Sequence, residues 1–318
     1  MSNIASQLSK QIKQIISAYN KSSNWCKVLI FCILLIILIV LFKDVKSLRK
    51  EGFVQNDKFL VKSGLDVYDD FYADIYDYLV FSNVKDDYEI GEIINKTTPS
   101  SQSKILDIGC GTGHHVDMIS SQGLDVIGID ISSAMIKKAK TNYPSRNFEV
   151  ADARDAEIFM SGSFTHIMSL YFTIYYIEDK RQFLQNCYNW LMPGGSLILH
   201  LVDREMFDPI LPSGNPLLLV SPQKYAEKRI TNTTVKFNDF AYNADFELDD
   251  KNNIAHFVEK FKNNENGKVR KNEHKMYMPD AQEIVDDAQQ IGFILESKVD
   301  LLQCQYEYQY LYIFRKPN

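Results

Sequence analysis

An apolar strand that runs straight into three closely spaced glycines is the feature that most constrains this chain. Residues 104–115 read KILDIGCGTGHH, so that Gly109, Gly111 and Gly113 follow a predicted strand and precede a predicted helix. Glycines at these positions let the backbone approach a bound ligand closely, and the amides at the start of the helix can bind an anionic group. The pattern predicts a strand, a ligand-binding turn and a helix.

Strands and helices continue to alternate after this unit. The further predicted strands cover 124–130, 147–150, 164–170 and 196–202, and the predicted helices cover 132–142 and 179–191. A helical pattern at 64–82 precedes the first strand, and a helix at 280–291 with strands at 293–301 and 308–315 closes the chain. Such alternation is typical of an α/β fold, in which parallel strands carry helices on both faces.

The segment 204–279 has a different pattern. Its stretches 233–242, 254–262 and 268–278 alternate polar and apolar residues, and short polar turns separate them. Alternation with a period of two residues, interrupted by turns, is typical of antiparallel hairpins. We therefore expect an antiparallel β insert within the α/β fold.

Acidic residues accompany three consecutive predicted strands. Asp107 lies in the first strand and Asp130 ends the second, 23 residues later, where an acidic side chain can bind the ribose diol of a nucleoside. Asp152 follows the third strand. Since parallel strands bring their carboxyl ends to one edge, these acids and the glycines predict a nucleoside site there. An NAD site would need G-x-G-x-x-G, and His114 occupies the position of the last glycine.

The motifs LDIGCGTG, IGIDIS, VADARD and LMPGG together resemble those of the class I S-adenosylmethionine-dependent methyltransferases. The resemblance covers about residues 64–203 and 280–316. It implies a Rossmann-like sheet of seven strands, the last of them antiparallel, and S-adenosylmethionine as the cofactor.

The resemblance also implies which residues contact the cofactor. Around the methionine moiety it places Asp107, Gly109, Gly111 and Gly113, and at the ribose hydroxyls Asp130. Around the adenine it places Ile131, Met135, Asp152 and Ala153, and below the sulfonium Leu170. The stretch YDDFYADIYD resembles the lid helix of many members, which implies that Tyr72 or Tyr76 contacts the cofactor.

None of these motifs specifies a catalytic residue. Methyl transfer is an in-line displacement with a neutral leaving group, so a general base is needed only where the nucleophile must lose a proton. The candidates follow the fourth and fifth strands: they are Tyr175, Tyr176 and His200, together with Asp203 and Glu205. Packing in the core is the alternative for the tyrosines, and a hydrogen-bonded buried imidazole is the alternative for His200.

An unbroken apolar run, VLIFCILLIILIVLF, occupies residues 28–42. Counted from Trp25 it reaches 18 residues, or about 27 Å as a helix, slightly short of the ~30 Å hydrocarbon core of a bilayer. A core helix would carry a polar face, and a signal peptide would end in small residues rather than in Lys-Asp-Val-Lys. We expect a retained membrane helix. Residues 4–19, apolar at helical spacing, predict an amphipathic helix before it, or a solvated helical tail.

A break in charge separates this segment from the rest of the chain. Residues 1–51 carry a net charge of +6 and residues 52–318 a net charge of −12, which predicts an anchor followed by a methyltransferase domain. The acidic balance of that domain argues against nucleic acid as a partner. The five cysteines are scattered, and His114 and His115 are adjacent, so neither a disulfide framework nor a metal site is predicted.

The sequence thus predicts a membrane-anchored S-adenosylmethionine-dependent methyltransferase. We expect residues 204–279 to cover an acceptor pocket and the methyl group to go to an oxygen or nitrogen of a small molecule. The alternatives are a methyltransferase of protein side chains and a non-catalytic membrane or structural protein that binds the cofactor. Basic residues flank the apolar run equally, but the cofactor is made in the cytosol and the cysteines suit a reducing compartment. We therefore expect a single-pass membrane protein with its catalytic domain facing the cytosol.

Overall fold

The computed structural model describes residues 23, 25–31, 33, 58–80, 82–209, 229 and 231–318. The chain divides into two units, Met1–Gly52 and Phe53–Asn318. In the first unit residues 25–31 are helical. The predicted amphipathic helix and most of the predicted membrane helix lie outside the described residues. Within the described ranges, no helix combines the length and the apolar character that crossing a membrane requires.

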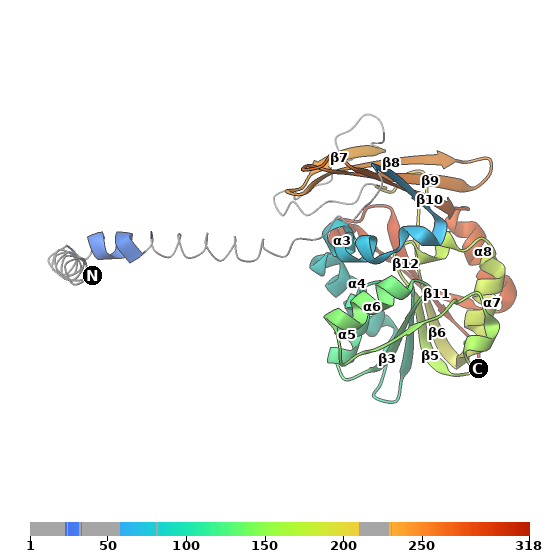
Figure 1. The fold of residues 1–318 in the computed structure, drawn as a ribbon. Helices are drawn as coiled ribbons and strands as arrows, with labels where there is room; N and C mark the ends of the chain where they lie inside the picture. The colour runs from blue at the N-terminus through green and yellow to red at the C-terminus, as the bar shows by residue number, and fades with distance from the viewer. Residues whose placement is uncertain are drawn as a thin grey trace, which may run out of the picture. The chain divides into compact units, whose positions relative to one another are not determined.

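The second unit is built on a mixed sheet of seven strands (Figure 1). These are β2 (Lys104–Ile108), β3 (Asp125–Asp130), β4 (Asn147–Val150), β5 (Phe164–Ser169), β6 (Leu191–Val202), β11 (Ile294–Asp300) and β12 (Gln309–Arg315). They lie in the order β11-β12-β6-β5-β2-β3-β4, and β12 is antiparallel to both of its neighbours. The other neighbouring strands pair in parallel. The predicted Rossmann-like sheet, with its last strand antiparallel, is confirmed.

Helices cover both faces of this sheet, as predicted (Figure 1). One face carries α4 (Asn83–Thr97), α5 (His114–Ser121) and α6 (Ser133–Asn142), and the other carries α7 (Lys180–Trp190) and α8 (Ala281–Ile291). Helix α4 was not predicted from the sequence. It begins at Asn83, where the Ser82 hydroxyl accepts a hydrogen bond from the Lys85 amide.

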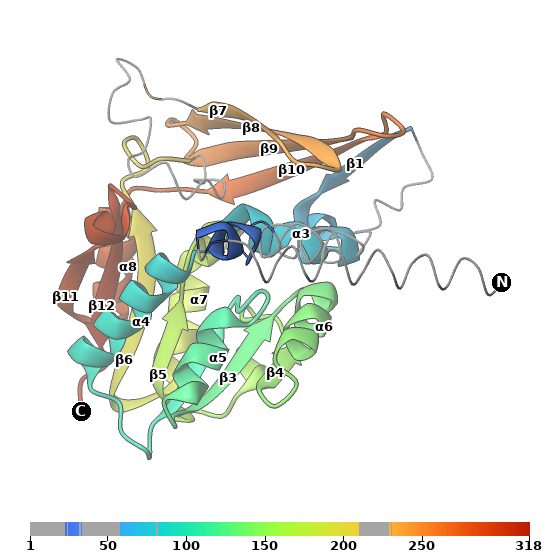
Figure 2. The ribbon, with the colours of Figure 1, turned by 90° about the vertical axis from the view of Figure 1, so that its left-hand side faces the viewer.

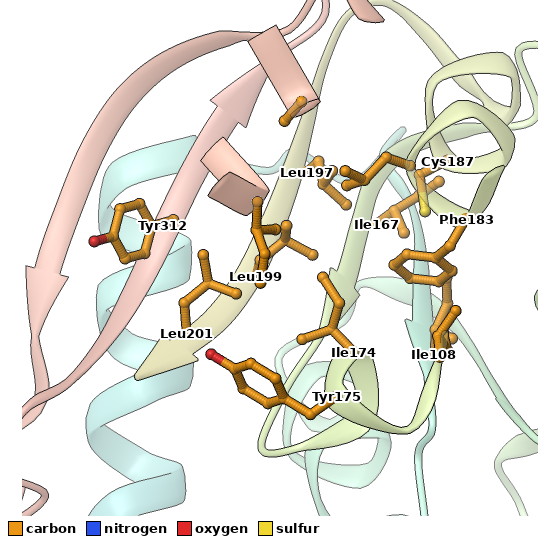
Figure 3. Packing of buried hydrophobic residues seen from close by; sticks show 14 of the residues in the cluster. Ile108, Ile167, Ile174, Tyr175, Phe183, Cys187, Leu197, Leu199, Leu201 and Tyr312 are labelled. Atoms are coloured by element: carbon orange, nitrogen blue, oxygen red, sulfur yellow. The ribbon is translucent and has the colours of Figure 1, made fainter. Parts of the chain in front are cut away.

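Two hydrophobic cores result, because alternate residues of a strand point to opposite faces. In β6, Leu197 and Leu199 belong to the core under α7 and α8, whereas Ile198 belongs to the core under α4, α5 and α6. Figure 3 shows Leu197 and Leu199 in the first of these cores, near Phe183 and Cys187 of α7. Burial of this kind on both faces stabilises each strand by about 1.5–3 kcal/mol per large apolar side chain.

The segment 204–279 forms antiparallel hairpins, as predicted, but its sheet has five strands. They are β7 (Asn232–Lys236), β8 (Phe240–Asp249), β9 (Ile254–Asn263), β10 (Val269–Tyr277) and, from the start of the unit, β1 (Phe59–Ser63). Strand β1 pairs in parallel with β10, which the sequence pattern did not predict. The predicted single stretch 233–242 is instead two strands, β7 and β8, joined by a turn. This sheet lies beyond the carboxyl ends of β2, β3, β5 and β6 (Figure 2).

Between the two sheets lies the segment predicted as helical at 64–82. It forms a short 3-10 helix, Gly64–Val67, and then helix α3 (Asp70–Val80). Arg270 of β10 holds the start of this segment, with hydrogen bonds to Asp69 Oδ2 at 2.9 Å and to the Val67 carbonyl at 3.0 Å. The five-stranded sheet therefore fixes α3 over the strand ends.

Candidate active site

A cavity of about 630 Å³ lies where these parts meet. Its walls come from the turn after β2, from the ends of β3 and β4, from the segment at 64–80 and from strands β8, β9 and β10. Most of its wall is apolar and aromatic. A cavity at the carboxyl ends of parallel strands is where open α/β sheets bind ligands.

The glycine turn forms one wall of this cavity. Gly109, Gly111 and Gly113 have φ angles of +75°, +54° and +93°, which other residues rarely adopt. Gly109 and Gly111 line the cavity. A Cβ at Gly111 would fit in van der Waals contact with a ring carbon of Tyr76, at 3.6 Å, so the Tyr76 ring lies against this part of the turn. At Gly113 a Cβ would lie 2.6 Å from Phe148 Cζ, so this glycine serves close packing.

The carboxylate of Asp130 is fixed beside this turn. Its Oδ2 accepts a hydrogen bond from the Gly111 amide at 3.1 Å, and its Oδ1 accepts one from the Ser132 amide at 2.8 Å. Burial raises the pKa of Asp130, and the two backbone donors oppose that shift. Each oxygen keeps a further lone pair. The side chain lines the cavity and can accept hydrogen bonds from a diol.

Asp107 is buried within β2, below the turn. Its Oδ2 has no hydrogen-bond partner among the residues that the structure describes. Burial raises its pKa to about 7, although His115 favours the charged form. The resemblance implies that Asp107 lies near the methionine moiety, and an unpartnered carboxylate oxygen at this point suits a nearby ammonium group.

The residues expected at an adenine occupy the neighbouring wall. Ile131, Met135, Asp152 and Ala153 all line the cavity. The carboxylate of Asp152 is already paired with Arg154, at 2.6 Å between Oδ2 and Nη2, and this pair lowers the pKa of Asp152. The edge of a bound adenine would therefore contact an Asp152 carboxylate that also forms an ion pair with the Arg154 guanidinium.

Three of the expected cofactor residues, Asp107, Gly113 and Leu170, do not line the cavity. Leu170 is buried in the hydrophobic core with Met168 and Ile198, while Tyr171, Phe172 and Thr173, which follow it, line the cavity. The turn after β5 therefore offers aromatic side chains to a ligand at this position.

Tyrosines form another part of the cavity wall. Tyr68, Tyr72 and Tyr76 of the segment at 64–80 line the cavity together with Tyr176, which follows β5. Their rings meet edge to face, with centroids 5.4 Å apart for Tyr68 and Tyr72 and 5.9 Å apart for Tyr68 and Tyr176. Burial raises the pKa of each of these phenols, so all four are protonated near neutral pH.

The chain has measurable similarity to known proteins. Residues 105–195 match a family model described as a methyltransferase domain. An N,N-dimethyltransferase of dTDP-4-amino-2,3,4,6-tetradeoxy-D-glucose from Saccharopolyspora spinosa is 30% identical over 140 residues, which are 42% of this chain and 55% of that protein. An N,N-dimethyltransferase of dTDP-3-amino-3,4,6-trideoxy-alpha-D-glucopyranose from Streptomyces venezuelae is 24% identical over 135 residues, 40% of this chain and 56% of that protein. The chain thus spans about half the length of these relatives.

Solved structures share the fold. An S-adenosylmethionine-dependent methyltransferase from Clostridium acetobutylicum superposes with a TM-score of 0.60 at 17% identity, over 78% of this chain and 98% of that one. Residues 105–195 thus belong to a methyltransferase domain, and the second unit has the fold of the S-adenosylmethionine-dependent methyltransferases. A sugar N-methyltransferase from Streptoalloteichus has the same fold, with a TM-score of 0.55 at 16% identity, over 74% of this chain and 88% of that one. The cofactor of this class is S-adenosylmethionine.

Of the five catalytic candidates, Tyr176 alone lines the cavity. Asp203 and Glu205 are exposed after the end of β6. Tyr175 is fully buried, and its hydroxyl accepts a hydrogen bond from the Val202 amide at 2.9 Å (Figure 3). His200 is fully buried beside Gln309, at 3.0 Å, and burial lowers its pKa to about 4. Tyr175 therefore packs in the core, and His200 is a hydrogen-bonded buried imidazole, which are the alternatives given for them in the sequence analysis.

Two residues of the methyltransferase site were missed by sequence reasoning. His274 of β10 lines the cavity and lies 2.9 Å from the Tyr176 hydroxyl, and Glu259 of β9 lies 2.9 Å from the other ring nitrogen of His274. The sequence signal that could have identified them is the alternation of buried and exposed positions along β10. The buried positions of β10 include Arg270, Asn272 and His274, which are polar residues where a strand of this kind usually carries apolar ones.

A buried charged cluster lies apart from the cavity walls, between α4 and α5. Asp86, Glu89 and His115 lie close enough together to share a metal ion. Lys85 Nζ already pairs with Glu89 at 2.7 Å. Burial disfavours a charged His115, but its contacts with Asp86 and Glu89 outweigh burial and raise its pKa to about 10. Lys85 and His115 therefore face the carboxylates of Asp86 and Glu89, and these charges balance within the protein.

Proposed function

We propose that the protein is an S-adenosylmethionine-dependent methyltransferase that methylates an amine nitrogen of a small molecule, with an amino sugar as the first candidate. The observation that carries this proposal is the composition of the cavity. One part of the wall is a glycine turn with the Asp130 carboxylate, and other parts are aromatic residues of the segment at 64–80 and of the five-stranded sheet. A cofactor on the first part leaves the others to the acceptor.

The residues present fit the cofactor. The cavity-lining backbone of Gly109 and Gly111 would hold the methionine part, and the accepting carboxylate of Asp130 would hold the ribose part. Ile131 and Met135 would flank the adenine. When bound, the cofactor supplies a methyl group on a cationic sulfonium. The tyrosine rings that line the cavity would face that charge and exclude water, and aromatic rings favour a desolvated cation.

The relatives favour nitrogen as the atom that is methylated. The proteins from Saccharopolyspora spinosa and Streptomyces venezuelae are named as N,N-dimethyltransferases of amino sugars linked to dTDP. Others are named as phosphoethanolamine and glycine/sarcosine N-methyltransferases, and one as an O-methyltransferase of ubiquinone biosynthesis. Small amines are the commonest acceptors among these names.

The enclosing sheet favours a small acceptor over a protein side chain. Phe246 of β8, Phe257 of β9 and Met276 of β10 line the cavity from the side opposite the strand ends. A side chain presented by a folded protein would need an open groove, whereas a small molecule needs a closed and largely apolar site with a few polar groups. The segment 204–279, together with β1, would then act as the predicted cover.

The experiment combines binding and turnover in the full-length protein. Calorimetry with S-adenosylmethionine measures cofactor binding. Transfer of a labelled methyl group is then followed to dTDP-linked 3-amino and 4-amino sugars, phosphoethanolamine and glycine, with a catechol as the oxygen acceptor. Methylation of one of the amines is expected. Cofactor binding with transfer only to the catechol, or only to proteins, would contradict the proposal.

Membrane anchoring is the second part of the proposal. The apolar run at 28–42 and the positive charge of residues 1–51 support an anchor, with the methyltransferase domain in the cytosol. The sequence Asn95-Lys96-Thr97 and the sequence Asn232-Thr233-Thr234 are glycosylation sequons whose asparagines are exposed. Expression in a eukaryotic host should leave both asparagines unmodified. Sugar on either one would place the domain on the other side of the membrane.

A further inference from the structure

A chain of three polar side chains connects the two sheets across the cavity wall. The Tyr176 hydroxyl lies 2.9 Å from His274 Nδ1, and His274 Nε2 lies 2.9 Å from Glu259 Oε2. Tyr176 comes from the turn after β5, whereas His274 and Glu259 come from β10 and β9. Tyr176 and His274 line the cavity, and Glu259 lies behind them, almost fully buried.

Glu259 is the fixed negative end of this chain. Burial would favour its protonated form, but hydrogen bonds from His274 and Tyr242 outweigh burial and lower the pKa of Glu259. The Tyr242 hydroxyl lies 2.8 Å from Oε1, and the Asn272 amide nitrogen lies 3.3 Å from Oε2. An ionised carboxylate only accepts hydrogen bonds. The proton on the His274 ring therefore sits on Nε2.

This tautomer determines what Tyr176 does. With Nε2 donating to Glu259, His274 Nδ1 carries a free lone pair and accepts the hydrogen bond from the Tyr176 hydroxyl. The Tyr68 ring meets the Tyr176 ring edge to face, with centroids 5.9 Å apart. A hydroxyl oxygen has two lone pairs, so the Tyr176 oxygen can accept a hydrogen bond from a donor inside the cavity.

We propose that Tyr176, His274 and Glu259 form a proton relay that takes the proton from the acceptor amine during methyl transfer. This inference rests on the proposed function. Stability alone does not require these residue types, since apolar side chains of the same volume often stabilise a buried position as well as polar or charged ones do. The relay ends at Tyr176, which follows the carboxyl end of β5. In the proposed function the acceptor lies at this edge of the sheet.

The acceptor nitrogen donates its lone pair to the methyl carbon, whose bond to sulfur breaks with its electron pair left on the sulfur. The N–H proton passes to the Tyr176 oxygen as the Tyr176 proton passes to His274 Nδ1. The resulting imidazolium is held by the carboxylate of Glu259. Because Tyr176 gives up one proton as it accepts another, its raised pKa does not prevent the transfer.

In this assignment Tyr176 is the catalytic residue, because it would touch the acceptor, and Glu259 is a positioning residue, because it acts through His274. Removing a general base typically slows a reaction by 10²–10⁴-fold. We expect Tyr176→Phe and His274→Gln each to lower kcat for a dTDP-linked amino sugar by about hundredfold. Glu259→Gln should have a smaller effect, because the amide still accepts a hydrogen bond through its oxygen.

Two readouts separate this relay from a structural role. The double variant Tyr176→Phe/His274→Gln should be no slower than the slower single variant, since residues that act as a unit are not additive. The Kd of S-adenosylmethionine should stay within about twofold in all of these variants. Tyr188→Phe, outside the cavity and partly buried beside Phe293, is the matched control and should leave kcat unchanged. Additive losses, or a Kd that rises in step with the fall in kcat, would overturn the relay.

Nitrogen NMR of the full-length protein with ¹⁵N-labelled histidine tests the tautomer without turnover. The His274 signals, assigned by their loss in His274→Gln, should show Nε2 protonated and Nδ1 as acceptor at pH 7.5. In Tyr176→Phe the Nδ1 signal should move, because it loses its donor. A protonated Nδ1 in the wild type would overturn the proposal. If no amine is methylated but the Nε2–H tautomer is found, the proposed function fails and the geometry of the relay stands.

Discussion

The Gly111 amide donates a hydrogen bond to Asp130 Oδ2 over 3.1 Å, and this bond joins the turn after β2 to the end of β3. The same carboxylate accepts the Ser132 amide at 2.8 Å, at the start of α6. One side chain therefore sets the position of two loops and faces the cavity. This relationship gives Asp130 a structural role, and its proposed role in binding the cofactor can be measured separately.

Replacing Asp130 with Ala should weaken cofactor binding. The variant loses a charge-assisted hydrogen bond to the ribose diol, worth roughly 1.5–3 kcal/mol, or about ten- to hundredfold in affinity. Calorimetry with S-adenosylmethionine measures the change. Asp130→Asn is the matched variant, which keeps the shape and one acceptor oxygen and should lose less. Unchanged affinity in Asp130→Ala would remove Asp130 from the cofactor site.

The glycines of the turn should respond differently to alanine. At Gly113 a methyl group would clash with Phe148, so Gly113→Ala should lower the free energy of unfolding by about 1–3 kcal/mol, as overpacking does. At Gly111 there is room for the Cβ, and its cost is mainly the positive φ, about 1 kcal/mol. Gly111→Ala should therefore lose more cofactor affinity than stability. Denaturant unfolding and calorimetry compare the two variants, and equal stability losses would contradict this division.

Asp107 should make the stability of the protein depend on pH. Burial raises the folded pKa of Asp107 to about 7, so the folded state binds a proton more tightly than the unfolded state does. Its contribution to stability is therefore present at low pH and is lost as the pH rises from about 4 to about 7. The stability of Asp107→Asn relative to the wild type should therefore rise as the pH increases through this window, by roughly 4 kcal/mol at most. Above about pH 7 the difference between the two proteins should stay constant.

The measurement is urea unfolding of both proteins, without cofactor, at several pH values between 4 and 8. Comparing the two proteins cancels the other titrating groups except those coupled to Asp107, of which His115 is the strongest. A difference in stability that does not change with pH would mean that Asp107 titrates normally in the folded state.

Deleting residues 1–51 should leave the methyltransferase domain intact. The described elements of the seven-stranded sheet, its helices and the cavity walls all lie between residues 58 and 318. The truncated chain should be soluble and should bind S-adenosylmethionine with the affinity of the full chain. Activity on an acceptor that resides in a bilayer should fall, because an anchor supplies effective concentration. An insoluble truncated chain, or one without cofactor binding, would show that the apolar run belongs to the fold.

Local pattern was enough to predict the parallel core of this protein. Strand β2, the glycine turn and α5 are contiguous in the chain, and their residue types fit the backbone conformations that they adopt. The period of the apolar residues separated the parallel strands from the hairpins of 204–279. Helix α4 and strand β1 were not predicted. The apolar residues of α4 keep helical spacing over only a short stretch, and β1 is too short for its partner strand to be inferred from the sequence.

The acceptor side of the cavity was decided by tertiary structure alone. Tyr175 and Tyr176 are adjacent in the sequence, yet one packs in the core and the other faces the cavity. His274 is 98 residues from Tyr176, and no local pattern relates the two. Residue type and spacing determine which conformation each segment prefers, but the packing of the five-stranded sheet against the strand ends determines which side chains meet. The cofactor turn is local in sequence and could be predicted, whereas the relay is not local and could not.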